Sequence, residues 1–232
     1  MSRSTGVLNG LCARVALVSM FAIAVSTSAV ASPVSVTMSL TADDEFALFA
    51  TDPITNTLTL IGQGNTWQFL YTFSFSAQPG SYIYVVGRDN TESVAMFVSK
   101  TVFNATDTVL TGDPNSWEVN TRYRSDNFTK TDPNEVLNWG GNWQTPAIGG
   151  EAGVFASLNA SLFGHLAPLG SARCIWAQPG GGNSGLFGAW GFPNDTGLGS
   201  ALFRLEVVPE PASMLALGAG LAGLMGLRRR KR

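Results

Sequence analysis

Residues 67–75 read Trp-Gln-Phe-Leu-Tyr-Thr-Phe-Ser-Phe, a run in which large aromatic side chains alternate with other residues and Leu70 is the one exception. Successive side chains of a β-strand point to opposite faces, so this alternation places one face in a core and the other in water. The same period of two occurs at residues 34–40, Val-Ser-Val-Thr-Met-Ser-Leu, and again at residues 201–207. These runs predict half-buried strands, of which 67–75 is the clearest.

Shorter apolar runs predict the remaining strands, and turn residues separate them, as in Gln78-Pro79-Gly80. No amphipathic helix is long enough to connect parallel neighbours, which favours antiparallel pairing. The fold class is therefore predicted as all-β, a single antiparallel β-sandwich or jelly roll over residues 32–208. Residues 125–150 are the least regular and are expected to lie as a long loop over the sheets. The shorter strands are expected at 45–50, 58–61, 81–86, 93–103, 108–111, 117–123, 153–158 and 171–177.

The first 31 residues have the three parts of a secretory signal peptide. Arg3 and Arg14 are the only charged residues, residues 15–25 are apolar, and Ala29-Val30-Ala31 is a small-x-small cleavage site. Cleavage by signal peptidase after Ala31 would leave Ser32 as the first residue. No Arg-Arg pair precedes the apolar run, so the Sec translocon is expected rather than the twin-arginine route.

The C-terminal tail, residues 209–232, also has an ordered composition. Pro209-Glu210-Pro211 comes directly after Val208, and its two prolines keep this segment extended and exposed. The uncharged segment Ala212 to Leu227 would span roughly 24 Å as a helix, short of the ~30 Å hydrocarbon core. The basic stop would stay in the cytoplasm, with the preceding domain outside. This stop consists of Arg228, Arg229, Arg230, Lys231 and Arg232.

Val208-Pro209-Glu210-Pro211, the short hydrophobic segment and the Arg-rich end resemble the PEP-CTERM sorting signal of Gram-negative bacteria. The resemblance implies recognition by an exosortase, a membrane protease and transferase, with cleavage near Pro209 to Pro211. It also implies a transient anchor in the inner membrane, then delivery to the cell surface or an extracellular polysaccharide matrix. An ordinary C-terminal anchor is the alternative, and it would keep the topology without the processing.

Removal of both ends changes the charge and the cysteine content of the domain. Seven Lys and Arg residues then face fifteen Asp and Glu residues, a net charge of −8. A basic patch for nucleic acid or anionic lipid is not expected. Cys12 leaves with the signal peptide and Cys174 remains alone, so no intramolecular disulfide is expected and the fold depends on its core.

The domain shows a second, fainter resemblance over residues 39–147. The run Ala42-Asp43-Asp44-Glu45-Phe46, Trp67 before a long strand, and later Trp139, Trp143 and Pro146-Ala147 look like the running order of a galactose-binding-like jelly roll. The Asn-Gly turn that usually follows such an acidic run is absent here. The resemblance implies a fold more directly than a ligand.

Trp139, Asn142 and Trp143 are the candidate ligand-binding residues. They lie in the Gly-containing run Asn-Trp-Gly-Gly-Asn-Trp-Gln, where flat rings with amide donors beside them would suit a sugar face. The alternative is that these rings close the end of the sandwich as ordinary buried tryptophans. Trp67, Trp117 and Trp176 are expected in the core.

No catalytic residues are expected, and no cofactor. A Cys174–His165 thiol dyad lacks a recognisable nucleophile motif, and a single histidine does not favour a zinc site. Asp43 and Asp44 are weak candidates for a structural calcium ion, although solvated turn residues are the favoured interpretation. A carboxylate pair formed with a distant residue such as Asp126 or Glu151 stays open.

Together these features predict an exported, non-catalytic β-sandwich that passes through the inner membrane and is sorted outward. Carbohydrate binding, with an extracellular polysaccharide as partner, is the leading hypothesis for the domain. A structural or adhesive matrix or biofilm protein without a small ligand is the alternative. A secreted polysaccharide hydrolase is third.

Overall fold

The computed structural model describes residues 32–52, 55, 57–89, 96–120, 122, 129–176 and 199–208. The predicted signal peptide, with its cleavage site at Ala29 and Ala31, and the predicted tail, residues 209–232, lie outside these ranges. Within these ranges, no helix has the length and apolar character needed to cross a bilayer.

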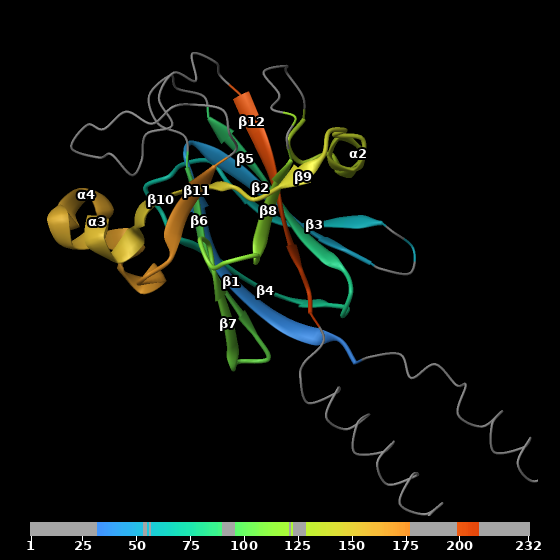
Figure 1. Cartoon of the computed structure of the whole chain (residues 1–232), viewed down its shortest axis with the longest axis horizontal. Helices are drawn as coiled ribbons and strands as arrows, with labels where there is room; N and C mark the ends of the chain where they lie inside the picture. The colour runs from blue at the N-terminus through green and yellow to red at the C-terminus, as the bar shows by residue number, and fades with distance from the viewer. Residues whose placement is uncertain are drawn as a thin grey trace, which may run out of the picture. The chain divides into compact units, whose positions relative to one another are not determined.

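In the part of the chain that the structure describes, two antiparallel sheets of six strands each form the fold. Figure 1 shows their arrangement. The first sheet runs in the order β10-β11-β6-β1-β4, and β7 also pairs with β6. Its strands are β1 (Val34–Ala42), β4 (Tyr71–Ala77), β6 (Phe97–Phe103), β7 (Asp107–Leu110), β10 (Ala147–Glu151) and β11 (Arg173–Trp176).

The second sheet runs in the order β3-β2-β5-β12-β8-β9. Along the chain, β1 lies in the first sheet and the β2-β3 pair in the second, and later strands return to one sheet or the other. The mostly β, antiparallel architecture confirms the predicted fold class at that level. The second sheet contains β2 (Glu45–Thr51), β3 (Leu58–Gly64), β5 (Tyr82–Asp89), β8 (Trp117–Asn120), β9 (Trp143–Gln144) and β12 (Gly199–Glu206).

The main core lies between the two sheets and takes side chains from both. Val36, Met38 and Leu40 of β1 are buried on alternate positions, as the sequence pattern predicts. Phe203 of β12 packs against Phe97 of β6 with ring centroids 4.9 Å apart, which joins the sheets. Burial of such side chains stabilises the fold by ~1.5–3 kcal/mol each. Trp117 and Trp176 belong to this core, as expected.

The predicted strand at 67–75 begins later than the alternation indicates. Trp67 to Leu70 form a turn region, and β4 begins at Tyr71. Phe69 is exposed, whereas Trp67 packs against the rings of Phe163 and His165 outside the main core. The prediction that Trp67 lies on the inward face of this strand is therefore wrong.

A helical cap, defined as residues 152–169, replaces the strand predicted at 153–158. It consists of α3 (Ala152–Leu158), α4 (Ala160–Phe163) and η1 (Gly164–Leu169). Ala152, Phe155 and Ala156 are buried in α3 at the spacing of one helix face, a period that the short apolar run did not distinguish from a strand. The cap packs on Met96 and Val98 in a second cluster.

A different segment covers part of the second sheet. The Trp139 loop, defined as residues 129–143, contains α2 (Pro133–Leu137) and lies on the other side of the molecule from the helical cap (Figure 1). Val136 and Trp139 of this loop pack against Phe49 of β2 and Leu202 of β12, on the outer face of the second sheet. The long loop expected at residues 125–150 is thus present only in part. Residues 129–142 lie over the second sheet with a short helix inside, whereas residues 143–144 and 147–151 form β9 and β10, and residues 125–128 lie outside the described ranges.

Candidate functional site

A cavity of about 320 Å³ lies between the Trp139 loop and the outer face of the second sheet. Strands β5, β12, β8 and β9 contribute to it, and the loop contributes its other residues. It is therefore built by segments more than 100 residues apart in the chain. The lining residues are Tyr84, Asn120, Val136, Leu137, Trp139, Gly140, Gly141, Trp143 and Leu202.

Asn120 is the buried polar side chain of this cavity, with 2% of its surface exposed. Its Oδ1 accepts a hydrogen bond of 2.9 Å from the backbone N–H of Arg122. Within the described ranges, its Nδ2 has no hydrogen-bond partner. This cavity-lining residue therefore has a free amide donor.

Gly141 allows the loop to approach Asn120. Its φ is +80°, and an added Cβ would lie 2.2 Å from Asn120 Oδ1 and 3.0 Å from the Arg122 backbone nitrogen. Gly140 precedes it with φ +74°. Only glycine fits both the left-handed backbone and the close contact at residue 141, so the Gly-Gly pair maintains the shape of the cavity.

Trp139 anchors the loop. Its Nε1–H donates to the Arg122 carbonyl oxygen at 2.7 Å, and Arg122 Nη1 donates to the Trp139 carbonyl oxygen at 3.0 Å. Only 1% of Trp139 is exposed, so its ring offers no stacking face. Of the two interpretations of this residue, the structure favours the buried one.

Trp143 is half-buried beside the cavity and lies among other large side chains. The Arg204 guanidinium is 4.1 Å from the centre of its ring, and the Tyr84 ring is 6.0 Å away. Asn142, the third predicted site residue, is exposed next to it. The structure therefore brings Trp143 together with residues of β5 and β12 that the sequence does not mark as a site.

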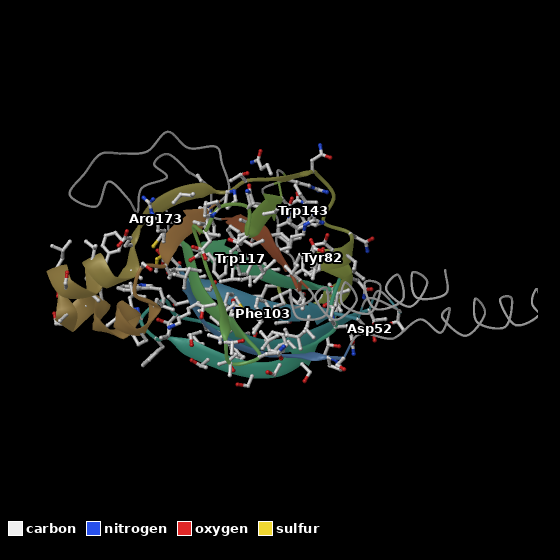
Figure 2. All side chains as sticks on the ribbon, turned by 60° about the horizontal axis from the view of Figure 1, so that its bottom comes forward. Asp52, Tyr82, Phe103, Trp117, Trp143 and Arg173 are labelled. Carbon is white, nitrogen blue, oxygen red and sulfur yellow. The ribbon has the colours of Figure 1, made fainter. Side chains whose placement is uncertain are left out.

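A neighbouring cavity of about 270 Å³ shares this face of the sheet. Arg204 lies at its edge, 4.6 Å from the centre of the Tyr82 ring, and donates to Glu118 at 2.6 Å. Figure 2 labels Tyr82 and Trp143, the two rings that Arg204 contacts. Arg204 pairs in register with both Tyr84 and Glu118 across the sheet. The cavity is lined by Tyr82, Asn115, Ser116, Trp117, Glu118, Thr145, Arg204 and Glu206.

Sequence reasoning did not assign Asn120, Tyr84 or Arg204 to the site. Burial raises the pKa of Tyr84, while the nearby positive charge of Arg204 lowers it less strongly. Tyr84 therefore stays a neutral hydroxyl at physiological pH. The alternation of Arg204 and Glu206 with Phe203 and Leu205 places the two charges on the outer face. That signal was present in the sequence, but the partners from β5 and β8 require the strand register.

The candidate calcium residues lie in the connection between β1 and β2. Asp43 is mostly buried and its backbone N–H donates to Met96 O, whereas the N–H of Asp44 donates to Arg88 O. Throughout the described ranges, no group of three or more His, Cys, Asp or Glu side chains is arranged to hold a metal ion. A structural calcium ion at Asp43 and Asp44 stays a prediction.

Cys174 is fully buried in the second cluster, with Sγ 3.8 Å from Met96 Sδ. Burial raises its pKa from 9.0 to about 12, so the thiol stays protonated at neutral pH. A thiolate nucleophile is disfavoured at such a site. Burial also lowers the pKa of His165, which packs against Trp67.

Comparison with known proteins gives a match for the C-terminal region. No curated protein and no solved structure matches the chain, so the galactose-binding-like resemblance stays a prediction. Residues 207–231 match the family model described as the PEP-CTERM protein-sorting motif. The motif confirms the first resemblance and implies an exported protein with a C-terminal sorting signal that an exosortase recognises and processes.

Proposed function

We propose that this exosortase cargo binds carbohydrate through the cavity beneath the Trp139 loop, at the cell surface or in an extracellular polysaccharide matrix. The Sec translocon and signal peptidase would export the chain, and the tail would hold it briefly at the inner membrane. The observation that carries the proposal is the Asn120 amide nitrogen, which has no hydrogen-bond partner within the described ranges, in a cavity bordered by Tyr84 and Trp143.

The composition of this cavity suits a sugar. Sugar rings have apolar C–H faces and a rim of hydroxyls, so their sites combine aromatic rings with a few fixed polar groups. Tyr84 and Trp143 supply the rings, and Asn120 supplies a fixed donor. The volume of about 320 Å³ lies at the lower end of the ~300–1,000 Å³ typical of small-ligand pockets.

Charge restricts the kind of sugar. The domain has a net charge of −8, and Arg204 is neutralised by Glu118 at 2.6 Å. Glu206 adds a further carboxylate to the neighbouring cavity. A polyanionic glycan would be repelled by this face, so an uncharged glycan is the expected ligand.

Replacement of Trp143 by Ala tests the proposal. We expect the full-length chain to bind a subset of neutral glycans on an array, and Trp143→Ala to weaken that binding about tenfold or more, because one ring of the cavity is lost. Ser76→Ala on the exposed side of β4 is the matched control and should bind normally. Absence of binding by the unmutated chain, or unchanged binding by Trp143→Ala, would contradict the proposal.

A matrix protein that adheres without a small ligand is a second candidate. The helical cap favours it, because residues 152–172 contain no Asp, Glu, Lys or Arg and expose Val154, Leu158 and Leu162. Under this hypothesis, Leu158→Ser would weaken adhesion to a biofilm matrix while Trp143→Ala would not. Polysaccharide turnover abolished by a carboxylate substitution would instead support the hydrolase hypothesis.

The position of exosortase cleavage is tested separately. Mass spectrometry of the chain expressed with and without an exosortase should show a new C-terminus near Pro209 to Pro211 only when the enzyme is present. An unchanged C-terminus in both cells would contradict processing at this position.

A further inference from the structure

We infer that the cavity beneath the Trp139 loop recognises the acetamido group of an N-acetylhexosamine residue. This inference rests on the proposed carbohydrate binding and specifies its ligand class. It is argued from a buried amide donor that lines the cavity, the apolar side chains beside it, and the charges nearby.

The donor is Asn120 Nδ2. Only 2% of Asn120 is exposed, and the Arg122 N–H bonded to its Oδ1 identifies Nδ2 as the end of the amide that is left for a ligand. The Trp139–Arg122 pair of hydrogen bonds holds that N–H in place. A buried donor gains most from a carbonyl oxygen, and a ligand that leaves it unpaired is bound less tightly.

Apolar side chains lie beside this donor. Val136 and Leu202 are almost fully buried and line the same cavity as Asn120, together with Trp139. An acetamido group has one carbonyl oxygen and one methyl group side by side, and it matches a donor that lies beside apolar side chains. The ammonium group of an unacetylated hexosamine would lose hydration there, and it cannot accept a hydrogen bond from Asn120 Nδ2.

The hydroxyls of an unmodified hexose fit this cavity less well. A hydroxyl can also accept from Asn120 Nδ2, but a hexose without the acetyl group brings no methyl group to the side chains of Val136 and Leu202. The cavity therefore discriminates in favour of the acetylated sugar.

The neighbouring cavity can take the rest of the glycan. Trp143 borders the first cavity, and Arg204 lies over its ring while lining the second. Asn115, Ser116 and Thr145 supply amide and hydroxyl groups there, and Glu118 and Glu206 disfavour a uronate. A neutral N-acetylated glycan that passes across Trp143 satisfies both cavities.

Saturation-transfer NMR with monosaccharides tests this inference on the full-length chain. The probes are N-acetylglucosamine and N-acetylgalactosamine, compared with glucose, galactose and glucosamine. We expect the acetamido methyl protons to receive the largest saturation, and at least one acetylated sugar to bind about tenfold or more tightly than its unacetylated parent.

Asn120→Asp provides the matched variant. It keeps the size of the side chain and an oxygen for the Arg122 N–H, but replaces the free donor with an acceptor. We expect it to abolish the preference for the acetylated sugar, whereas Ser76→Ala keeps it. If this variant folds poorly, the saturation that the unmutated chain transfers to the acetamido methyl protons of the sugar still tests the inference.

The outcomes separate this inference from the proposed function. Equal binding of acetylated and unacetylated sugars, or a preference that persists in Asn120→Asp, would overturn the acetamido assignment while carbohydrate binding stands. Binding of no sugar in either the NMR panel or the glycan array would overturn both.

Discussion

The two sheets are each covered on part of their outer face, but by segments that are held in different ways. The helical cap covers the first sheet with apolar side chains, in a stretch without charged residues. The Trp139 loop covers the second sheet and is fixed by directional bonds, including Lys130 to Glu45 at 2.5 Å and Lys130 to Asn65 at 2.9 Å.

This difference indicates which covering suits a binding site. Apolar packing is non-directional and favours close filling of space. Hydrogen bonds and ion pairs can instead hold a segment above a sheet at a set height, and the Trp139 loop encloses a cavity in this way. Four predictions test this comparison.

Trp139→Ala should cause the largest loss of stability. We expect the free energy of unfolding to fall by ~3–5 kcal/mol, because a fully buried ring is lost and the Arg122 carbonyl loses its donor. Trp143→Ala removes a half-buried ring and should cost less than half as much. Urea unfolding of both variants measures the difference, and equal losses would show that the loop has no single anchor.

Gly141→Ala should destabilise the loop by ~1–3 kcal/mol through backbone strain and steric overlap. Gly80→Ala is a matched control, since Gly80 has φ +81° against +80° at Gly141 but nothing within 4 Å of an added Cβ. The stability difference between the two variants isolates the contact with Asn120. If both lose the same amount, the close approach at residue 141 contributes nothing.

The helical cap should respond to high pH through Cys174. Its pKa is 9.0 in the unfolded chain and about 12 in the folded one, so its contribution is fully present below pH 9 and declines as pH rises from about 9 to about 12. Above pH 9 this loss amounts to ~1.4 kcal/mol per pH unit. Denaturation at pH 8 and pH 10 should therefore show a smaller pH effect in Cys174→Ala. A pH effect as large as that of the parent chain would mean that the thiol is not enclosed.

Leu158→Ser should have the smallest effect, because Leu158 is 70% exposed on the outer side of the helical cap. We expect the free energy of unfolding to change by no more than ~0.5 kcal/mol. Phe155, on the buried side of the same helix, provides the contrast, and Phe155→Ala should cost ~3–5 kcal/mol. A large loss in Leu158→Ser would show that the cap is covered by another part of the molecule.

The sequence predicts the strands best where one face is in water. In β1, Ser35, Thr37 and Ser39 alternate with buried apolar residues, and the observed strand follows the pattern. The start of β4 was misplaced because Trp67 and Phe69 continue an aromatic alternation into a turn. A period of two in side-chain type does not reveal where hydrogen bonding to β1 ends, and that pairing ends at Tyr71.

The candidate site was only partly predictable. The run from Trp139 to Trp143 marked the right loop, because Gly-Gly between two tryptophans is unusual for a strand or a helix. The neighbouring residues in the sequence do not show that Trp139 is buried while Trp143 borders a cavity. That distinction arises from Arg122, which bonds Trp139, and from Arg204, which covers Trp143 from a strand 61 residues further along the chain.

The last described strand, β12, lies in the interior of its sheet, with β5 on one side and β8 on the other. It pairs with β5 over eight residues, and Val207 continues the bonding to Ser81. The sorting motif follows directly in the sequence. A pull on the tail along the strand axis would therefore load these bonds in shear, so that many must break together. The domain is thus mechanically suited to withstand tension that is applied through its C-terminal sorting signal.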